Sequence, residues 1–192
     1  MKKLYILLFF SIQTIFAQEY SVEKSIFSAQ AGILGFWVNN ESRLSNQFTL
    51  KSEIGLDVFS TVDPDDNNDF NSLVPVIILE PRWYYNLEKR GRKGRNIYNN
   101  GGNFIALTTS FHSDWFVISG KNNVYVNDQL LLVPKWGIKR NIGNSNFNYE
   151  LGAGLGYNFI LSKKYPSDDG SEVFLDLHAR IGYTFKSSHK RQ

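Results

Sequence analysis

Several features that define common protein classes are missing from this chain of 192 residues. Cysteine is absent, which excludes disulfide cross-links and thiolate chemistry. After the N-terminal region, no segment reaches the roughly 18 consecutive apolar residues that indicate a transmembrane helix. The net charge is only +3, and basic residues gather in two short stretches, 88–95 and 186–192. Because nucleic-acid binding needs a broad basic surface, we expect no nucleic-acid partner.

The first 17 residues have the pattern of a secretory signal peptide. Lys2 and Lys3 precede an apolar run over 4–10, and Ala17 ends the segment with a small residue. A membrane anchor is the alternative, but the run is shorter than the ~20 apolar residues of a span. We therefore predict export and cleavage after Ala17, which leaves 19 basic and 18 acidic residues in the mature chain.

A long alternation of apolar and polar residues is the main positive signal, and it is typical of strands with two different faces. Over 147–161, the odd positions carry Phe, Tyr, Leu and Ala, whereas the even positions up to 158 carry Asn, Glu and Gly. Similar runs cover 48–59, 74–87, 103–114, 130–140 and 173–185, and a more apolar run covers 26–38. Most are longer than the ~5–6 residues of soluble strands.

These lengths match the ~9–11 tilted residues that cross a bilayer. The sequence therefore predicts an all-β fold: a closed antiparallel up-and-down transmembrane β-barrel over residues 18–185, with a basic C-terminal extension over 186–192. A soluble lipocalin-like barrel is the main structural alternative, and it would place the apolar rows inside.

The strand count leaves one strand to be located. Seven runs are recognisable, whereas single-chain bacterial barrels have an even number of strands, so we predict eight. We expect the eighth in 18–24 or inside a connection. Counting back from a periplasmic Phe185 places the connection 61–73 outside the cell and the connection 88–102 on the periplasmic side.

The polar faces of the runs carry many charges of both signs, which are costly in an apolar core unless they are paired. In a narrow barrel they can pair across the lumen, and the bare positions Gly152, Gly154 and Gly156 leave room for long side chains. A lumen filled in this way is packed and is not an open channel. The predicted interior cluster consists of Lys51, Glu53, Asp57, Glu80, Arg82, His112, Asp114, Lys135, Lys139, Glu150, Asp176, His178 and Arg180.

Aromatic residues gather near the ends of the runs, as expected for girdles at the two membrane interfaces. Core packing is the alternative explanation for several of them. The predicted girdle consists of Trp37, Trp83, Tyr85, Trp115, Trp136, Tyr149, Tyr183 and Phe185.

Two motifs resemble those of known proteins. The last run, over 174–185, resembles the C-terminal signal of outer-membrane barrels, in which alternating apolar residues end on an aromatic one; here 186–192 follows that aromatic. The segment 80–90 and the Ala17-Gln18 junction resemble those of small uncharacterised OmpA-type barrel proteins of flavobacteria and other Bacteroidota. The resemblance implies an outer-membrane fold and location, assembly by the barrel assembly machinery, and no assigned activity.

Three other constellations favour structure over chemistry. His112, Ser113 and Asp114 suggest a hydrolase, but alternation turns Ser113 away from the other two, toward lipid, so we predict an interior pair of His112 and Asp114. Asp176, His178 and Arg180 form a second interior row, better explained by ion pairing than by a metal. The Asp-rich segment 63–69 lacks the Gly and Glu of a calcium loop, which favours a solvated loop or loose divalent bridging to lipopolysaccharide.

The function predicted from the sequence is that of a monomeric, non-enzymatic outer-membrane barrel with a structural or envelope-interaction role. We expect contacts with membrane lipid and lipopolysaccharide, a periplasmic or cell-wall contact through the basic stretch 88–95, and no cofactor. A small-solute channel and a lipid A-modifying enzyme remain the alternatives.

Overall fold

A computed structural model describes residues 20–62, 69–120, 126–162 and 172–187. The predicted signal peptide 1–17 and its cleavage site lie outside the described residues. No helix in the described ranges is long and apolar enough to cross a membrane. The elements are β1 (Ser25–Gly32), β2 (Gly35–Arg43), β3 (Phe48–Val62), β4 (Asp69–Trp83), α2 (Leu87–Arg92), η1 (Tyr98–Asn100), β5 (Asn103–His112), β6 (Gln129–Asn141), β7 (Phe147–Ile160) and β8 (Val173–Ser187).

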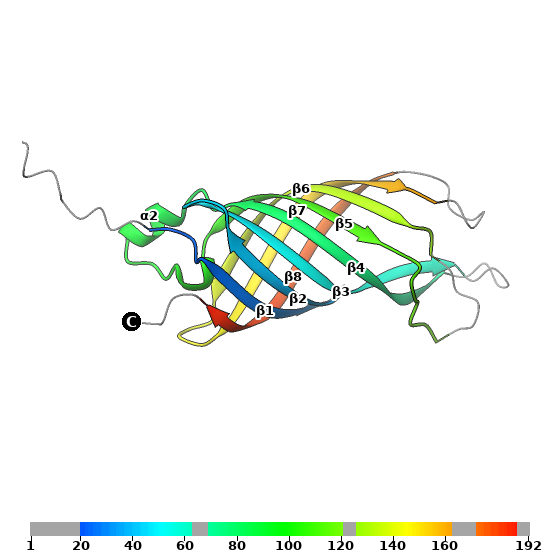
Figure 1. The fold of residues 1–192 in the computed structure, drawn as a ribbon, viewed down its shortest axis with the longest axis horizontal. Helices are drawn as coiled ribbons and strands as arrows, with labels where there is room; N and C mark the ends of the chain where they lie inside the picture. The colour runs from blue at the N-terminus through cyan, green and yellow to red at the C-terminus, as the bar shows by residue number, and fades with distance from the viewer. Residues whose placement is uncertain (1–19, 63–68, 121–125, 163–171, 188–192) are drawn as a thin grey trace, which may run out of the picture.

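The eight strands form one closed barrel in chain order, and every neighbouring pair is antiparallel. The barrel closes where β1 pairs with β8, from Ile26 opposite Ser187 to Gly32 opposite Arg180. Figure 1 shows the strands running obliquely around the barrel. The prediction of an all-β, eight-stranded, up-and-down barrel is confirmed.

The expected place of the eighth strand was wrong. The apolar run over 26–38 is not one strand: it contains β1 and the start of β2, which reverse at Ile33 and Leu34. Two glycines allow this tight reversal. Gly35 has φ +142, and a Cβ there would lie 2.0 Å from the carbonyl oxygen of Leu56. The turn was missed because its two central residues are apolar.

Other element boundaries also differ from the expected ones. β3 runs to Val62 and β4 begins at Asp69, so both strands extend into the stretch expected to be a loop. β5 ends at His112, which leaves Ser113 and Asp114 outside the strand. β8 continues through Ser187 and so includes the first residues of the predicted extension.

Both ends of the described chain lie at the same end of the barrel, together with α2 and η1 (Figure 1). We call this the capped end, because side chains close it. Val22, Tyr84, Leu87 and Phe104 are fully buried there and pack together with Ala106. The opposite end, which holds the β1–β2 turn, is called the rim end.

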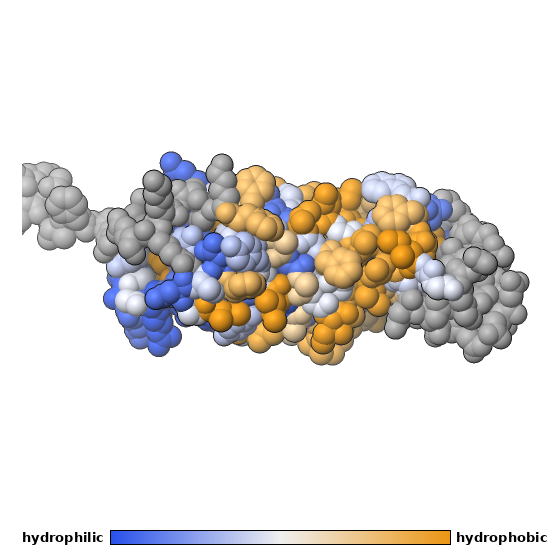
Figure 2. All heavy atoms as spheres, turned by 90° about the horizontal axis from the view of Figure 1, so that it is seen from below, coloured by the Kyte–Doolittle hydropathy of each residue, from blue (hydrophilic) through white to orange (hydrophobic). Residues whose placement is uncertain are grey.

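Apolar side chains point outward and charged ones inward along the strands. Leu151 and Leu177 are 43% and 60% exposed, whereas Glu150, which precedes Leu151 in β7 and so points to the opposite face, is 1% exposed. Figure 2 shows hydrophobic side chains spread over one outer face of the barrel. The core of this protein is therefore a polar lumen surrounded by an apolar exterior.

Candidate functional site

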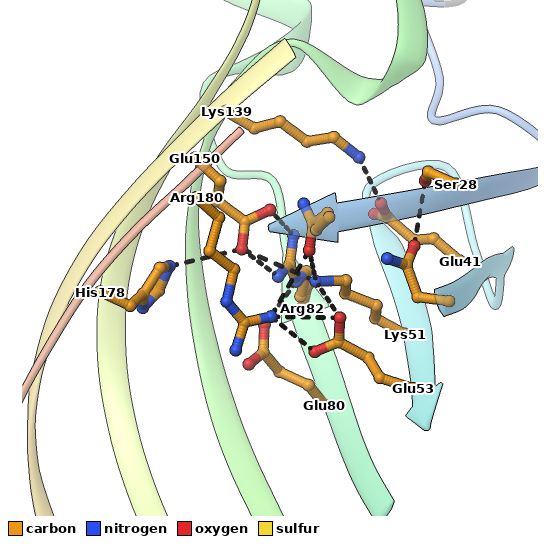
Figure 3. Close-up of polar contacts among 12 residues, drawn as sticks. Ser28, Glu41, Lys51, Glu53, Glu80, Arg82, Lys139, Glu150, His178 and Arg180 are labelled. Atoms are coloured by element: carbon orange, nitrogen blue, oxygen red, sulfur yellow. Dashed lines mark hydrogen bonds and ion pairs between the residues drawn. The ribbon is translucent and has the colours of Figure 1, made fainter. Parts of the chain in front are cut away.

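A network of buried charges fills the middle of the lumen, and Arg82 lies at its centre (Figure 3). The Arg82 guanidinium donates two hydrogen bonds to the two carboxylate oxygens of Glu150, at 2.8 and 2.6 Å, and its Nε donates to Glu80 at 2.5 Å. Lys51 lies 2.7 Å from Glu53 and 3.8 Å from Glu150. These five side chains come from β3, β4 and β7, so the network ties distant strands together across the axis.

A second set of contacts extends the network in both directions along the lumen. Arg180 donates to Glu53 at 3.0 Å and stacks over the Trp37 ring at 3.7 Å. Toward the capped end, Lys139 donates to Glu41 at 2.8 Å. Toward the rim end, Lys135 lies 2.9 Å from Asp176.

The pairing is close to complete, which explains how so much charge is tolerated away from water. An unpaired buried charge costs several kcal/mol, whereas a paired and hydrogen-bonded one recovers most of that cost. Arg82, Lys51 and Glu150 are each 1% exposed. Charged side chains therefore fill the middle of the lumen, and the apolar cluster lies at its capped end.

His112 pairs with a different carboxylate from the one expected. Its Nε2 lies 2.7 Å from Asp57 Oδ2, and Asp57 Oδ1 accepts a hydrogen bond from Trp37 Nε1 at 2.6 Å. Asp114 lies beyond the end of β5, so the predicted pair of His112 and Asp114 is wrong. His178 lies 3.4 Å from Glu150, within the interior row expected for it.

The predicted aromatic girdle is found on the outside except at Trp37. Trp37 is 3% exposed and points into the lumen, because it follows Gly35 in β2 rather than continuing the face of β1. Trp115 is exposed but lies in the segment after β5. The other predicted girdle residues point outward near the capped end: Trp83, Tyr85, Trp136, Tyr149, Tyr183 and Phe185.

The hydrolase constellation does not assemble among the described residues. Ser113 is buried rather than turned toward lipid, and its hydroxyl donates to Asp128 at 2.9 Å. Within the same ranges, no group of three or more His, Asp or Glu is arranged to hold a metal ion. Residues 63–68 of the Asp-rich segment lie outside the described residues.

The interior position of several polar residues was not predicted from the sequence. Glu41 is fully buried, and its carboxylate accepts hydrogen bonds from Lys139, Tyr84 and Thr49. It belongs to β2, the strand that the alternation did not separate. An inward Glu six residues after Gly35 would have been found had the turn been recognised.

A hollow lies on the rim side of the network. Its inner wall combines apolar side chains with a few polar ones, and the hollow continues to the outer face of the sheet. The inner wall consists of Trp37, Asp57, Phe59, Ile78, Thr108, Ser110, His112, Leu131, Val133, Lys135, Phe174, Asp176, His178 and Arg180.

The fold and site together define a closed eight-stranded antiparallel barrel with charged side chains buried in its lumen. No family model, curated protein or solved structure matches this chain.

Proposed function

We propose that this chain is an outer-membrane β-barrel protein of a Gram-negative bacterium, exported through its N-terminal signal peptide, with a structural or envelope-interaction role. One observation carries the proposal: large apolar side chains cover the outside of the barrel while the charges are buried inside. Ile54, Leu155 and Leu175 are each 60% exposed or more. In water such a surface would be strongly unfavourable, at about 25 cal/mol per Å² of apolar area.

The outer rings support a membrane position as well. Amphipathic aromatic rings prefer the boundary between headgroups and acyl chains. Trp83 and Tyr85 lie in edge contact near the capped end, and Tyr85 accepts a hydrogen bond from Trp136 at 2.8 Å. Exposed rings near the rim end include Trp115 and Phe116. Two rows of rings around an apolar belt are the arrangement expected of a spanning barrel.

The envelope contact is proposed for the capped end, which we assign to the periplasmic side because both ends of the described chain lie there. Lys89, Lys93 and Arg95 are exposed there on and after α2. Arg90 holds the segment on the barrel by donating to the carbonyl oxygens of Gly101 and Asn96. This basic surface suits anionic lipid headgroups or cell-wall polymers.

Cell fractionation combined with heat-modifiable gel mobility tests the proposal. The full chain, expressed with its own N-terminus, is expected in the outer-membrane fraction. It should migrate faster unboiled than boiled, because a closed barrel stays folded in detergent. Recovery of the folded protein in the periplasm without detergent would overturn the proposal.

A further inference from the structure

The barrel wall is uneven in height, because the β1–β2 hairpin is shorter than the strands beside it. The hairpin ends where Gly32 pairs with Gly35, next to Arg180 of β8 and Asp57 of β3. β3 nevertheless continues to Val62, and β8 starts at Val173. Over these extensions, none of the described strands lies between β3 and β8. The wall therefore has a notch above the hairpin, and Figure 1 shows β1 and β2 ending well short of the β3–β4 tip.

The hollow in the lumen reaches the outside at this notch. Its lining joins inward side chains to residues that border the notch or face outward beside it. With this outer part included, its volume is about 770 Å³. The border and outer part consist of Ile33, Leu34, Val58, Trp136, Ile138, Leu151, Ala153, Leu175, Leu177 and Ala179. A polar interior and an apolar exterior thus share one continuous space.

The composition of the hairpin tip indicates what lies outside the notch. Two-residue hairpin turns normally carry Gly, Asn or Asp. Here the two residues are Ile33 and Leu34, which are 86% and 49% exposed. An apolar tip of this kind is more stable in contact with hydrocarbon than with water. On the proposed function, on which this inference rests, the notch opens sideways to acyl chains.

Two polar groups of the hollow, His112 and Asp176, can accept hydrogen bonds from a ligand. Both oxygens of Asp57 accept, one from Trp37 and one from His112 Nε2; in the tautomer with the hydrogen on Nε2, Nδ1 is an acceptor. That Nδ1 is buried and has no hydrogen-bond partner among the described residues, and His112 as a whole is 2% exposed. Asp176 adds a carboxylate with a 21% exposed side chain.

We propose that the hollow binds a single-chain amphiphile whose head donates hydrogen bonds, such as a long-chain amine or alcohol. The head enters sideways through the notch and donates to His112 Nδ1 or to Asp176; an ammonium head, with three N–H groups, can donate to both. The chain stays outside, along Leu177 and Ala179. Because the network and the capped end close the lumen below, the ligand is bound in a blind site and does not pass through.

Native mass spectrometry of the full chain, released from detergent micelles, tests this proposal. Dodecylammonium and dodecanol are expected to be retained at one molecule per barrel, and dodecyl sulfate, with the same chain and an acceptor head, should not be. An equal retention of all three probes, or of none, would overturn the proposal.

Two variants and a matched control locate the site. His112→Phe keeps a ring but removes the acceptor, and should lower retention about three- to tenfold, the value of one hydrogen bond. Ala179→Trp should lower it by filling the outer part, whereas Ala29→Trp, outward on β1 and outside the hollow, should not. Equal losses in the two Trp variants would mean that no such site exists.

The outcomes separate this inference from the proposed function. Heat-modifiable mobility shows which variants are folded, and Asp176→Asn replaces His112→Phe if the latter does not fold. A membrane-inserted barrel that retains neither donor probe contradicts the ligand site alone. A chain that is soluble without detergent contradicts the membrane proposal itself.

Discussion

At the scale of single residues, Arg82 holds the largest share of the lumenal pairing. It bonds two carboxylates from two strands, and its guanidinium also lies 4.2 Å from the centre of the Phe104 ring. Removing it leaves the buried Glu150 with Lys51 at 3.8 Å and His178 at 3.4 Å as the ion-pair partners that the described residues supply.

Arg82→Leu is therefore expected to lower the free energy of unfolding by about 3–5 kcal/mol, because it leaves the buried carboxylate of Glu150 without its main ion-pair partner. Adding Glu150→Leu should restore part of the loss, since the second charge is then gone. Urea unfolding in phospholipid vesicles, followed by tryptophan fluorescence, measures both. The control is Arg92→Leu, which breaks only the exposed pair with Glu88 and should cost about 0–1 kcal/mol.

Side-chain direction was the most predictable property at this scale. Period-two alternation alone assigned Lys51, Arg82 and Glu150 to the inner face, because successive side chains of a strand point to opposite faces of the sheet. Trp37 was misassigned because it lies across an unrecognised strand boundary, and Asp114 lies beyond the end of β5, where the alternation no longer applies. Pairing partners such as Asp57 and His112 depend on strand register around the barrel, which no local pattern contains.

At the scale of elements, glycines let neighbouring strands accept large rings. A Cβ on Gly137 would lie 2.3 Å from the Phe104 ring, and one on Gly156 would lie 2.3 Å from the Phe174 ring. Phe104 is fully buried in the capped-end cluster, whereas Phe174 is half-buried at the hollow.

Gly137→Ala should consequently destabilise the barrel by about 1–3 kcal/mol, because the packed Phe104 ring cannot move away. Gly156→Ala carries the same added methyl group and should cost less, since Phe174 has space beside it. Comparison of the two unfolding midpoints in urea decides the point. A larger loss in Gly156→Ala would mean that the hollow is more tightly packed than described.

The β1–β2 turn gives a test of membrane depth. Leu34→Arg is expected to cost between about 1 and 3 kcal/mol, because it carries a charge into the apolar belt. Asn144→Arg, in the exposed β6–β7 turn, should cost almost nothing. Unfolding from vesicles measures both variants, and equal costs would place the two turns in the same medium.

The same turn explains why the eighth strand was not located from the sequence. Turn signals in sequence are polar or flexible residues, which mark places where the backbone meets water. A turn that lies in an apolar medium lacks that signal. Only Gly32 and Gly35, spaced around two apolar residues, marked the reversal.

At the scale of the whole molecule, buried side chains fill the lumen at two levels, so we expect the barrel not to act as a conduit. Planar-bilayer recordings of the refolded chain should show no stepwise conductance, because both the ion network and the apolar cap span the lumen. The Arg82→Leu variant tests whether the ion network is needed to prevent conductance. We expect no conductance steps from this variant either, because the apolar cluster at the capped end is unchanged in it. Regular conductance steps from the unaltered chain would favour the small-solute channel.

The shared position of the two ends of the described chain has a consequence for how such a protein can diversify. The described strands that end at the rim end are joined in pairs along the chain, and both ends of the described chain lie at the capped end. Insertions between β3 and β4, β5 and β6, or β7 and β8 therefore leave strand pairing intact. The connections at the rim end can therefore change in sequence and length, for example as epitopes or attachment points, while the lumenal ion pairs preserve the barrel fold.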